Sequence, residues 1–181
     1  MESDNKRIKL SRLNTCILYF FIFAFIGWLL ETFYSLYELG HFTKRGFLLG
    51  PICPIYGFGA LILILFFSKY KNNNLKLFFY SAIVFSLFEY LVGFGLDALF
   101  GLKFWDYTSE SFNLNGRISI FFSFAWGIIA IIFINHLYPF IKRKINVLLS
   151  KTPYKLQISI VRILCVLFFA DTIVSCIRYL I

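Results

Sequence analysis

The residues of this chain whose chemistry stands out are four acids that lie inside long apolar segments: Glu31, Glu89, Asp97 and Asp171. If those segments cross a bilayer, a charged carboxylate near the centre costs at least about 2.5–3.5 kcal/mol. Such a group must face other helices or a wet cavity, find a partner, or take up a proton. Ion pairing, proton transfer and the binding of a polar ligand are therefore the chemistry to expect.

Two arginines in connecting segments, Arg45 and Arg117, each follow one of these acids along the chain. A guanidinium offers a rigid fork of donors that fits carboxylate or phosphate oxygens. Side chains with acceptors and amides accompany Arg117 in its loop. We predict that a substrate-binding polar site draws on Glu31, Arg45, Glu89, Asp97, Asp106, Asn113, Asn115 and Arg117.

The two segments that carry these arginines are irregular. The first is apolar but rich in Gly and Pro, which interrupt a helix and permit left-handed turns, so we predict a broken or re-entrant entry to the helix that follows. An ordinary surface turn is the alternative. In the second segment, Asn115-Gly116 is a turn signal and the aromatic residues suit the interfacial belt of a membrane protein. The predicted structural loop residues are Gly46, Gly50, Pro51, Pro54, Tyr56, Gly57, Trp105, Tyr107 and Gly116.

The elements that must position these residues follow from the composition. The chain has 181 residues, of which 60% are hydrophobic, 22% aromatic and 15% charged. Soluble domains carry about 25% charged and about 45–50% apolar residues. This excludes a soluble enzyme, a disordered chain and a secreted disulfide scaffold. The fold class is therefore all-α, a polytopic helical membrane protein that forms a single integral membrane domain over residues 1–181.

About five transmembrane helices are predicted, because a bilayer core takes roughly 20 helical residues. The second apolar segment reaches that length only if 46–54 also enters the membrane. The domain divides into a basic cytoplasmic N-terminus (1–12), a first hairpin (13–68), a second hairpin (75–138) and a fifth helix (158–181). The five predicted spans are Leu13–Leu36, Ile55–Phe67, Leu75–Phe100, Ile118–Tyr138 and Ile158–Leu180.

The basic residues predict the orientation. Twelve Lys and Arg residues fall on one side of the predicted spans and five on the other, and the side with the excess belongs in the cytoplasm. The N-terminus is therefore expected inside and the C-terminus outside. Because the twelve are divided among three short segments, they indicate topology and not nucleic-acid binding. They are Lys6, Arg7, Lys9, Arg12, Lys69, Lys71, Lys76, Lys142, Arg143, Lys144, Lys151 and Lys155.

A short pattern recurs in the first and third spans. In each, a Gly precedes an acid by four residues, as Gly27 precedes Glu31 and Gly93 precedes Asp97. Residues four apart share a helix face, and Gly lets another helix approach closely. This suggests a duplicated helix–loop–helix hairpin plus one extra helix, although chance similarity between apolar helices is the alternative. In duplicated transporters the site lies at the interface of the repeats.

Cofactor and metal sites are not predicted. The four Cys residues form no CxxC pair, which speaks against a metal site or a disulfide framework. The sequence also lacks GxxxxGK[ST], the loop that cradles nucleotide phosphates. If ATP is used, another chain must bind it.

The loop motifs carry a family resemblance. They read RGFLLGPICPIYGFGAL at 45–61, FWDYTSESFNLNGR at 104–117 and AWG at 125–127. With these motifs the chain resembles the bacterial ABC-transporter type IV permeases, also called CmpB-like. The resemblance implies a multi-pass protein of the bacterial plasma membrane. It also implies a partner, either a separate ATPase subunit or further copies of the chain, besides the lipid bilayer itself.

Three functions remain open at this stage. The first is the membrane subunit of a transport system, with an outward-facing polar site between the two hairpins and a polar cavity that joins the loops to Glu89. The second is a membrane scaffold or sensor that does not transport and binds a partner. The third is an intramembrane enzyme acting on a lipid or envelope substrate, although no catalytic residue can be named.

Overall fold

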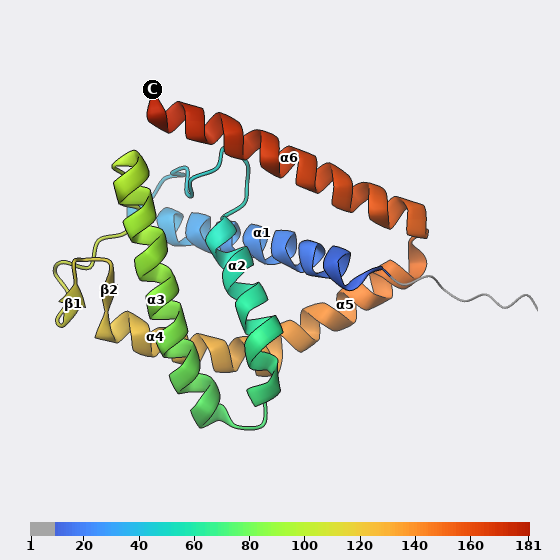
Figure 1. Cartoon of the computed structure of the whole chain (residues 1–181), viewed down its shortest axis with the longest axis horizontal. Helices are drawn as coiled ribbons and strands as arrows, with labels where there is room; N and C mark the ends of the chain where they lie inside the picture. The colour runs from blue at the N-terminus through green and yellow to red at the C-terminus, as the bar shows by residue number, and fades with distance from the viewer. Residues whose placement is uncertain (1–9) are drawn as a thin grey trace, which may run out of the picture. The chain divides into compact units, whose positions relative to one another are not determined.

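The computed structural model describes residues 10–181. The first nine residues of the predicted cytoplasmic segment 1–12 lie outside the described part. Four long apolar helices, each able to span a membrane, and one shorter apolar helix account for most of the described chain, which confirms the predicted all-α membrane fold (Figure 1). The long ones are Arg12–Leu39, Asn74–Phe100, Ile120–Lys151 and Tyr154–Leu180, and the shorter one is Pro54–Tyr70.

Helix α1 covers Arg12–Leu39 and is bounded by clear capping residues. The Ser11 side chain accepts a hydrogen bond from the backbone of Asn14 at its start. Gly40 ends it in the left-handed conformation, with φ of +72°, as Gly commonly does after a helix. The helix is therefore a turn longer than the predicted span Leu13–Leu36.

The second apolar helix is composite. It begins as α2 (Pro54–Ile62), passes through a π-helical segment at Leu63–Phe67, and ends in a 3-10 turn at Ser68–Tyr70. Pro is well placed at a helix start because its missing N–H would have no helical acceptor there. No helix or strand occurs in residues 40–53. The stretch is irregular, as the sequence predicts, and the choice between a re-entrant entry and an ordinary surface turn stays a prediction.

Helix α3 (Asn74–Phe100) and helix α4 (Ile120–Ile132) pack along each other. Gly127 of α4 lies against the ring of Phe78 on α3, and the hydroxyl of Ser86 donates to that of Ser123 at 2.6 Å. Between these helices, β1 (Asn113–Leu114) and β2 (Ile118–Ser119) form a short antiparallel hairpin.

The continuous helix that starts with α4 is longer than predicted. It continues through a π-helical segment at Phe133–Leu137 into α5 (Tyr138–Lys151), whereas the predicted span ends at Tyr138. The basic stretch after Tyr138, expected as a connecting segment, is therefore helical. Helix α6 (Tyr154–Leu180) begins four residues before the predicted Ile158. Polar and basic residues can extend a helix beyond the apolar part that hydropathy detects.

The chain divides into two compact units. The first unit comprises residues 1–58, of which 10–58 are described, together with Arg143–Cys176, and the second comprises Gly59–Lys142 with Ile177–Ile181. The predicted hairpins 13–68 and 75–138, and their duplication, stay predictions.

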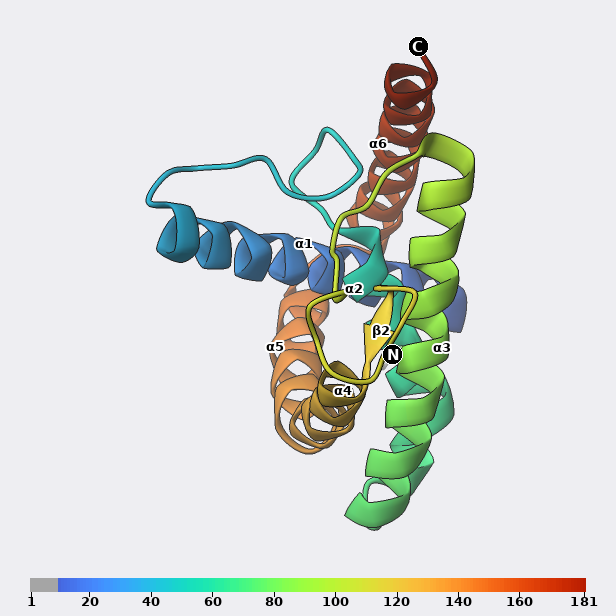
Figure 2. The ribbon, with the colours of Figure 1, turned by 90° about the vertical axis from the view of Figure 1, so that its left-hand side faces the viewer.

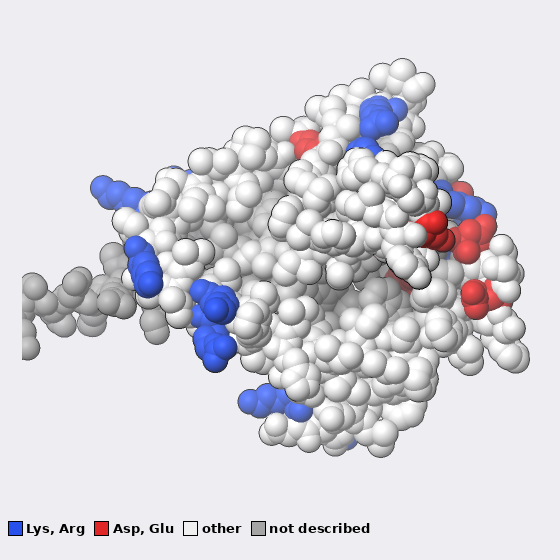
Figure 3. All heavy atoms as spheres, turned by 180° about the vertical axis from the view of Figure 1, so that it is seen from behind, with Lys and Arg blue, Asp and Glu red and all other residues white. Residues whose placement is uncertain are grey.

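Many large apolar side chains are exposed on the helices of both units, and few are fully buried. Most of the face drawn in Figure 3 is uncharged, with Lys, Arg, Asp and Glu in small groups. A soluble domain rarely exposes so much contiguous apolar surface. Lipid is the solvent that suits this surface, as the composition predicts.

Candidate functional site

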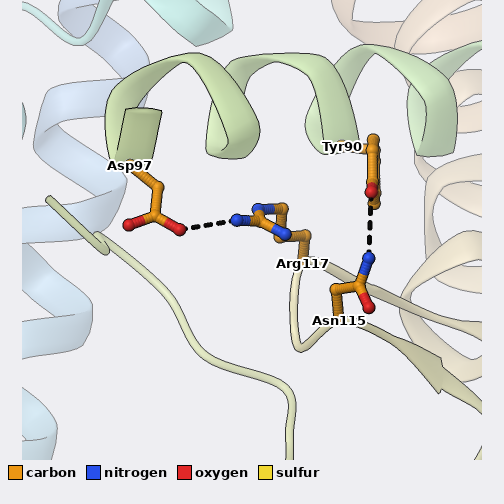
Figure 4. Close-up of polar contacts among 4 residues, drawn as sticks. All are labelled: Tyr90, Asp97, Asn115 and Arg117. Atoms are coloured by element: carbon orange, nitrogen blue, oxygen red, sulfur yellow. Dashed lines mark hydrogen bonds and ion pairs between the residues drawn. The ribbon is translucent and has the colours of Figure 1, made fainter. Parts of the chain in front are cut away.

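In the second unit, helix α3 carries two of the predicted site residues, Glu89 and Asp97. Glu89, Gly93 and Asp97 recur every four residues along it, and such residues lie on one helix face. Arg117, which follows the β1–β2 turn, reaches this face and pairs with Asp97 at 2.5 Å (Figure 4). Both side chains of the pair are partly exposed, at 20% and 32%. The sequence prediction that these two residues belong to one site is consistent with this contact.

Aromatic rings and backbone bonds hold Arg117 in place. Its guanidinium lies 5.7 Å from the ring centre of Tyr90 and 5.6 Å from that of Phe94, close enough for a cation–π interaction. The indole N–H of Trp105 donates to the Arg117 carbonyl at 2.9 Å. Gly93 has no side chain, and a Cβ there would approach the Trp105 ring to 3.1 Å. The glycine therefore makes room for the loop that carries the arginine.

The turn before Arg117 has the conformation that Asn115-Gly116 predicts. Both residues have positive φ, at 55° and 66°, and the Arg117 amide donates to the Leu114 carbonyl at 3.0 Å. This is the arrangement of a type I′ hairpin turn. The Asn115 side-chain amide donates to the Tyr90 hydroxyl at 3.0 Å (Figure 4). Asn115 therefore ties the tip of the turn to α3.

Asn113 and Asp106 organise the loop itself. Asn113 accepts a hydrogen bond from the Gly116 amide and donates to the carbonyls of Thr108 and Glu110. Asp106 accepts from the Thr108 amide at 2.9 Å. That backbone hydrogen bond, with a second bond from the Thr108 side chain and the charge of Lys103, lowers the pKa of Asp106 below its ordinary value. Both residues were predicted to bind substrate, but their bonds here are to the loop.

A small hollow lies beside Arg117. Its volume is about 290 Å³ when the space open to solvent is included. The part that can hold water is only about 10 Å³, which is about one molecule. A larger ligand would need the loop to move. The hollow is lined by Gly93, Leu96, Leu102, Lys103, Phe104, Trp105, Asp106, Asn115, Gly116 and Arg117. Glu89 is not among these residues, and the predicted cavity joining the loops to Glu89 stays a prediction.

Glu89 forms a separate centre, two helical turns before Asp97. Its side chain is 5% exposed. One carboxyl oxygen accepts from the Tyr107 hydroxyl at 2.9 Å, and the other accepts from the Trp126 indole N–H at 3.0 Å. Tyr107 belongs to the loop and Trp126 to α4, so one carboxyl joins three parts of the unit. We call these three residues the Glu89 centre.

In the first unit, Tyr56 packs against the other Gly–acid pattern, Gly27 and Glu31. The ring of Tyr56 occupies the space that a side chain at Gly27 would fill, and its hydroxyl donates to Glu31. A Cβ at Gly57 would likewise meet the Phe20 ring. Tyr56 and Gly57, predicted as structural loop residues, thus let the start of α2 pack closely against α1.

The irregular stretch before α2 is held by Asp171 of α6. The amides of Leu49 and Gly50 each donate to one carboxylate oxygen at 2.8 Å, and the Ser175 hydroxyl donates at 3.0 Å. Asp171 thus provides an acceptor for two backbone amides of a stretch that has no helix or strand to pair them. Gly50 is also confined, because a Cβ there would lie 3.0 Å from the Asp171 carboxylate. Asp171 was noticed in the sequence as a deep acid, but its partner was not predicted.

Arg45 lies half-buried at the start of this stretch, and none of the described residues forms an ion pair with it. Gly46 follows in the left-handed conformation, with φ of +85°, and faces the Cys53 sulfur.

The sequence reasoning missed Trp126 as a hydrogen-bond donor to Glu89. The AWG motif that contains it was the signal that could have indicated it.

The two Gly–acid patterns have parallel surroundings. In each, an aromatic ring occupies the space beside the glycine, Tyr56 at Gly27 and Trp105 at Gly93. In each, the acid also accepts a hydrogen bond from a side chain later in the chain, from Tyr56 of α2 at Glu31 and from Arg117 at Asp97. The similarity is one of local contacts within each unit.

One comparison with known proteins finds a family model that covers most of the chain. The model of a family described as "Putative ABC-transporter type IV" matches residues 18–176. The chain belongs to this family. The match includes both loop motifs, both Gly–acid patterns and the Glu89 centre. Comparison with characterised proteins and with solved structures finds no match.

Proposed function

We propose that this chain is the membrane-spanning subunit of a transport system and that the Glu89 centre is its polar site within the membrane. The observation that carries the proposal is the burial of Glu89. A carboxyl group in an apolar helix is energetically costly, and such residues therefore usually mark a functional site. This one is 5% exposed and has a hydrogen-bond donor on each oxygen. Membership of an ABC-transporter family supports the same function.

The link between the loop and Glu89 suggests how the site would work. Tyr107 belongs to the segment that also carries Asp106 and is tied to Arg117 through the Tyr107 amide, which donates to the Gly116 carbonyl at 2.8 Å. A displacement of this loop would withdraw the Tyr107 hydroxyl and leave one carboxyl oxygen of Glu89 without its donor. A polar solute or a proton could then replace it. Arg117, Asp97 and the hollow beside them would form the first contact for an anionic group.

The energy source and the orientation are parts of the proposal. Because the sequence contains no nucleotide-binding loop, an ATPase subunit would be a separate chain. The distribution of basic residues favours a cytoplasmic N-terminus and places the β1–β2 loop outside. Glu31 and Arg45 would belong to the same outer side. The three residues of the Glu89 centre all belong to the predicted second hairpin, 75–138, so the proposed site is built from that hairpin.

The test is affinity purification of the tagged chain from its native membranes, followed by measurement of ATP hydrolysis. We expect an ATPase to co-purify with the wild-type chain. Glu89→Gln should keep the partner but lower the turnover of ATP, because it alters the transport site and not the assembly. Glu110→Gln, which removes an exposed loop carboxyl, is the matched control and should behave as wild type.

Two results would contradict the proposal. Recovery of well-folded protein with a partner that hydrolyses no nucleotide would favour a scaffold. Equal ATPase turnover for Glu89→Gln, Glu110→Gln and wild type would remove Glu89 from the mechanism.

A further inference from the structure

Four buried polar atoms in one segment of the first unit have no hydrogen-bond partner. Among the described residues, five buried side-chain nitrogen or oxygen atoms are unpartnered, and only that of Ser81 lies elsewhere. The four are the hydroxyls of Thr32, Ser35 and Thr43 and the Nε atom of Arg45. Buried polar groups in native proteins are almost always paired. Four exceptions lie within the fourteen residues from Thr32 to Arg45, and this concentration indicates a missing partner.

Two of the four lie on one face of α1. Thr32 and Ser35 are three residues apart, and residues at that spacing are neighbours on a helix surface. Thr32 is 8% exposed and Ser35 is 0% exposed. Their neighbours Phe33 and Tyr34 are exposed. The protein itself therefore covers the face with the two hydroxyls.

The segment after α1, which carries Thr43 and Arg45, returns along the helix. At its end, the Cys53 amide donates to the Ala24 carbonyl at 3.0 Å, and Gly46 already faces the Cys53 sulfur. From Ala24 to Leu39 the helix rises about 22 Å, which seven extended residues can cover. Residues 40–46 must therefore run back beside the last turns of α1, as Figure 2 shows.

The missing partner must offer acceptors and negative charge. Nε of Arg45 can only donate, and each hydroxyl can donate. Glu31 does not fill this role, because the hydrogen bond from Tyr56 engages it and no ion pair with Arg45 forms among residues 10–181. Water could satisfy the hydroxyls but would not neutralise the arginine. A tetrahedral oxyanion supplies several acceptors and the charge together.

We propose that Thr32, Ser35, Thr43 and Arg45 form a binding site for a phosphate group, which we call the donor cluster. The ligand is an anionic phospholipid headgroup or free phosphate, which share this chemistry. The phosphate would accept from the guanidinium and from the hydroxyls that now lack partners. The site is built only from the first unit and does not depend on the proposed role of Glu89.

The test measures ligand-dependent thermal stability of the full-length protein in a neutral detergent. The probes are a phosphatidylglycerol, a phosphatidylcholine and inorganic phosphate, each titrated separately. We expect saturable stabilisation by phosphatidylglycerol, and weak or no stabilisation by phosphatidylcholine. Stabilisation by inorganic phosphate at comparable concentration would identify free phosphate as a ligand, and its absence would identify the lipid.

Three variants assign the effect to the donor cluster. Arg45→Gln should weaken binding by about 10- to 100-fold, the range expected for a lost hydrogen bond with a charged group. Ser35→Ala, which removes one hydroxyl and little volume, should weaken it by about 2- to 10-fold. Lys44→Gln removes the same charge from the adjacent, exposed residue and should change binding by less than about 2-fold, as surface charges do.

Two results would overturn the proposal. The first is that neither phosphatidylglycerol nor phosphate stabilises the wild-type protein. The second is that Lys44→Gln weakens binding as much as Arg45→Gln, which would mean general attraction to positive charge. If Arg45→Gln does not fold, Ser35→Ala decides, since unchanged binding in that variant would place the ligand elsewhere.

Discussion

Replacing Tyr107 by Phe removes one hydroxyl from the Glu89 centre and little else. The Tyr107 ring stacks on Phe122, with ring centres 4.2 Å apart and planes inclined by 16°, and Phe can keep this contact. The backbone bond from Tyr107 to Gly116 is also unaffected. The variant therefore isolates the hydrogen bond of 2.9 Å from the hydroxyl to Glu89.

The size of the effect depends on the charge of Glu89. Hydrogen bonds between neutral side chains inside membrane proteins contribute about 0.6 kcal/mol on average. A hydrogen bond to a charged group contributes about 1.5–3 kcal/mol. Because Glu89 is 5% exposed, little water can replace the lost donor. With an ionised Glu89 we therefore expect Tyr107→Phe to lower the free energy of unfolding by about 1.5–3 kcal/mol.

Steric trapping in bicelles can measure this free energy at equilibrium. The same substitution is made in a Glu89→Gln background, where the acceptor is neutral and the loss should fall to about 0.6 kcal/mol. Tyr90→Phe is the control, because it removes a tyrosine hydroxyl from the residue that follows Glu89. Tyr90 bonds to the exposed Asn115, so its loss should stay below about 0.5 kcal/mol.

A loss of about 1.5–3 kcal/mol in both backgrounds would refute the reasoning. It would mean that the Tyr107 hydroxyl stabilises the unit through something other than the Glu89 carboxylate. A loss near 0.6 kcal/mol in the wild-type background would refute the ionised state only.

Two further predictions concern the first Gly–acid pattern and the loop before β1. Gly27→Ala should destabilise the first unit by about 1–3 kcal/mol in unfolding measurements, as overpacking does, because the new Cβ overlaps the Tyr56 ring. Gly95→Ala is the control and should be neutral or stabilising, since nothing lies within 4 Å of its Cβ. A harmless Gly27→Ala would contradict the contact between Gly27 and Tyr56. The lowered pKa of Asp106 means that its bond to Thr108 stabilises the loop above the ordinary Asp pKa and is lost as pH falls through the lowered value. Trp105 fluorescence should follow this transition on acidification, Asp106→Asn should remove that component, and a transition unchanged in Asp106→Asn would assign it to another group.

The sequence was sufficient to predict the four long apolar helices, because a run of about 20 apolar residues is visible directly in the order of residues. It also indicated Arg117 and Asp97 as one site, since topology placed them on the same side of the membrane. It could not predict which acid Arg117 would choose, because that depends on how the Asn115-Gly116 turn aims the side chain. The helical continuation after Tyr138 was missed for a related reason, as polar helices leave no hydropathy signal.

The loop contacts were the least predictable part. Asp171 lies more than a hundred residues after the amides that it accepts from, and no local pattern connects them. The roles of Asn113 and Asp106 were also unforeseen. Their side chains suit a ligand equally well, and only the fold shows that the loop uses them.

The bond between Asp171 and the stretch before α2 has a consequence for how the protein is made. Chains are synthesised from the N-terminus and domains tend to fold as they emerge. The amides of Leu49 and Gly50 leave the ribosome long before their acceptor on α6 exists. This stretch must therefore wait, hydrated or otherwise protected, until α6 has been inserted. A late step of biogenesis, and not the first, gives the entry to α2 its finished form.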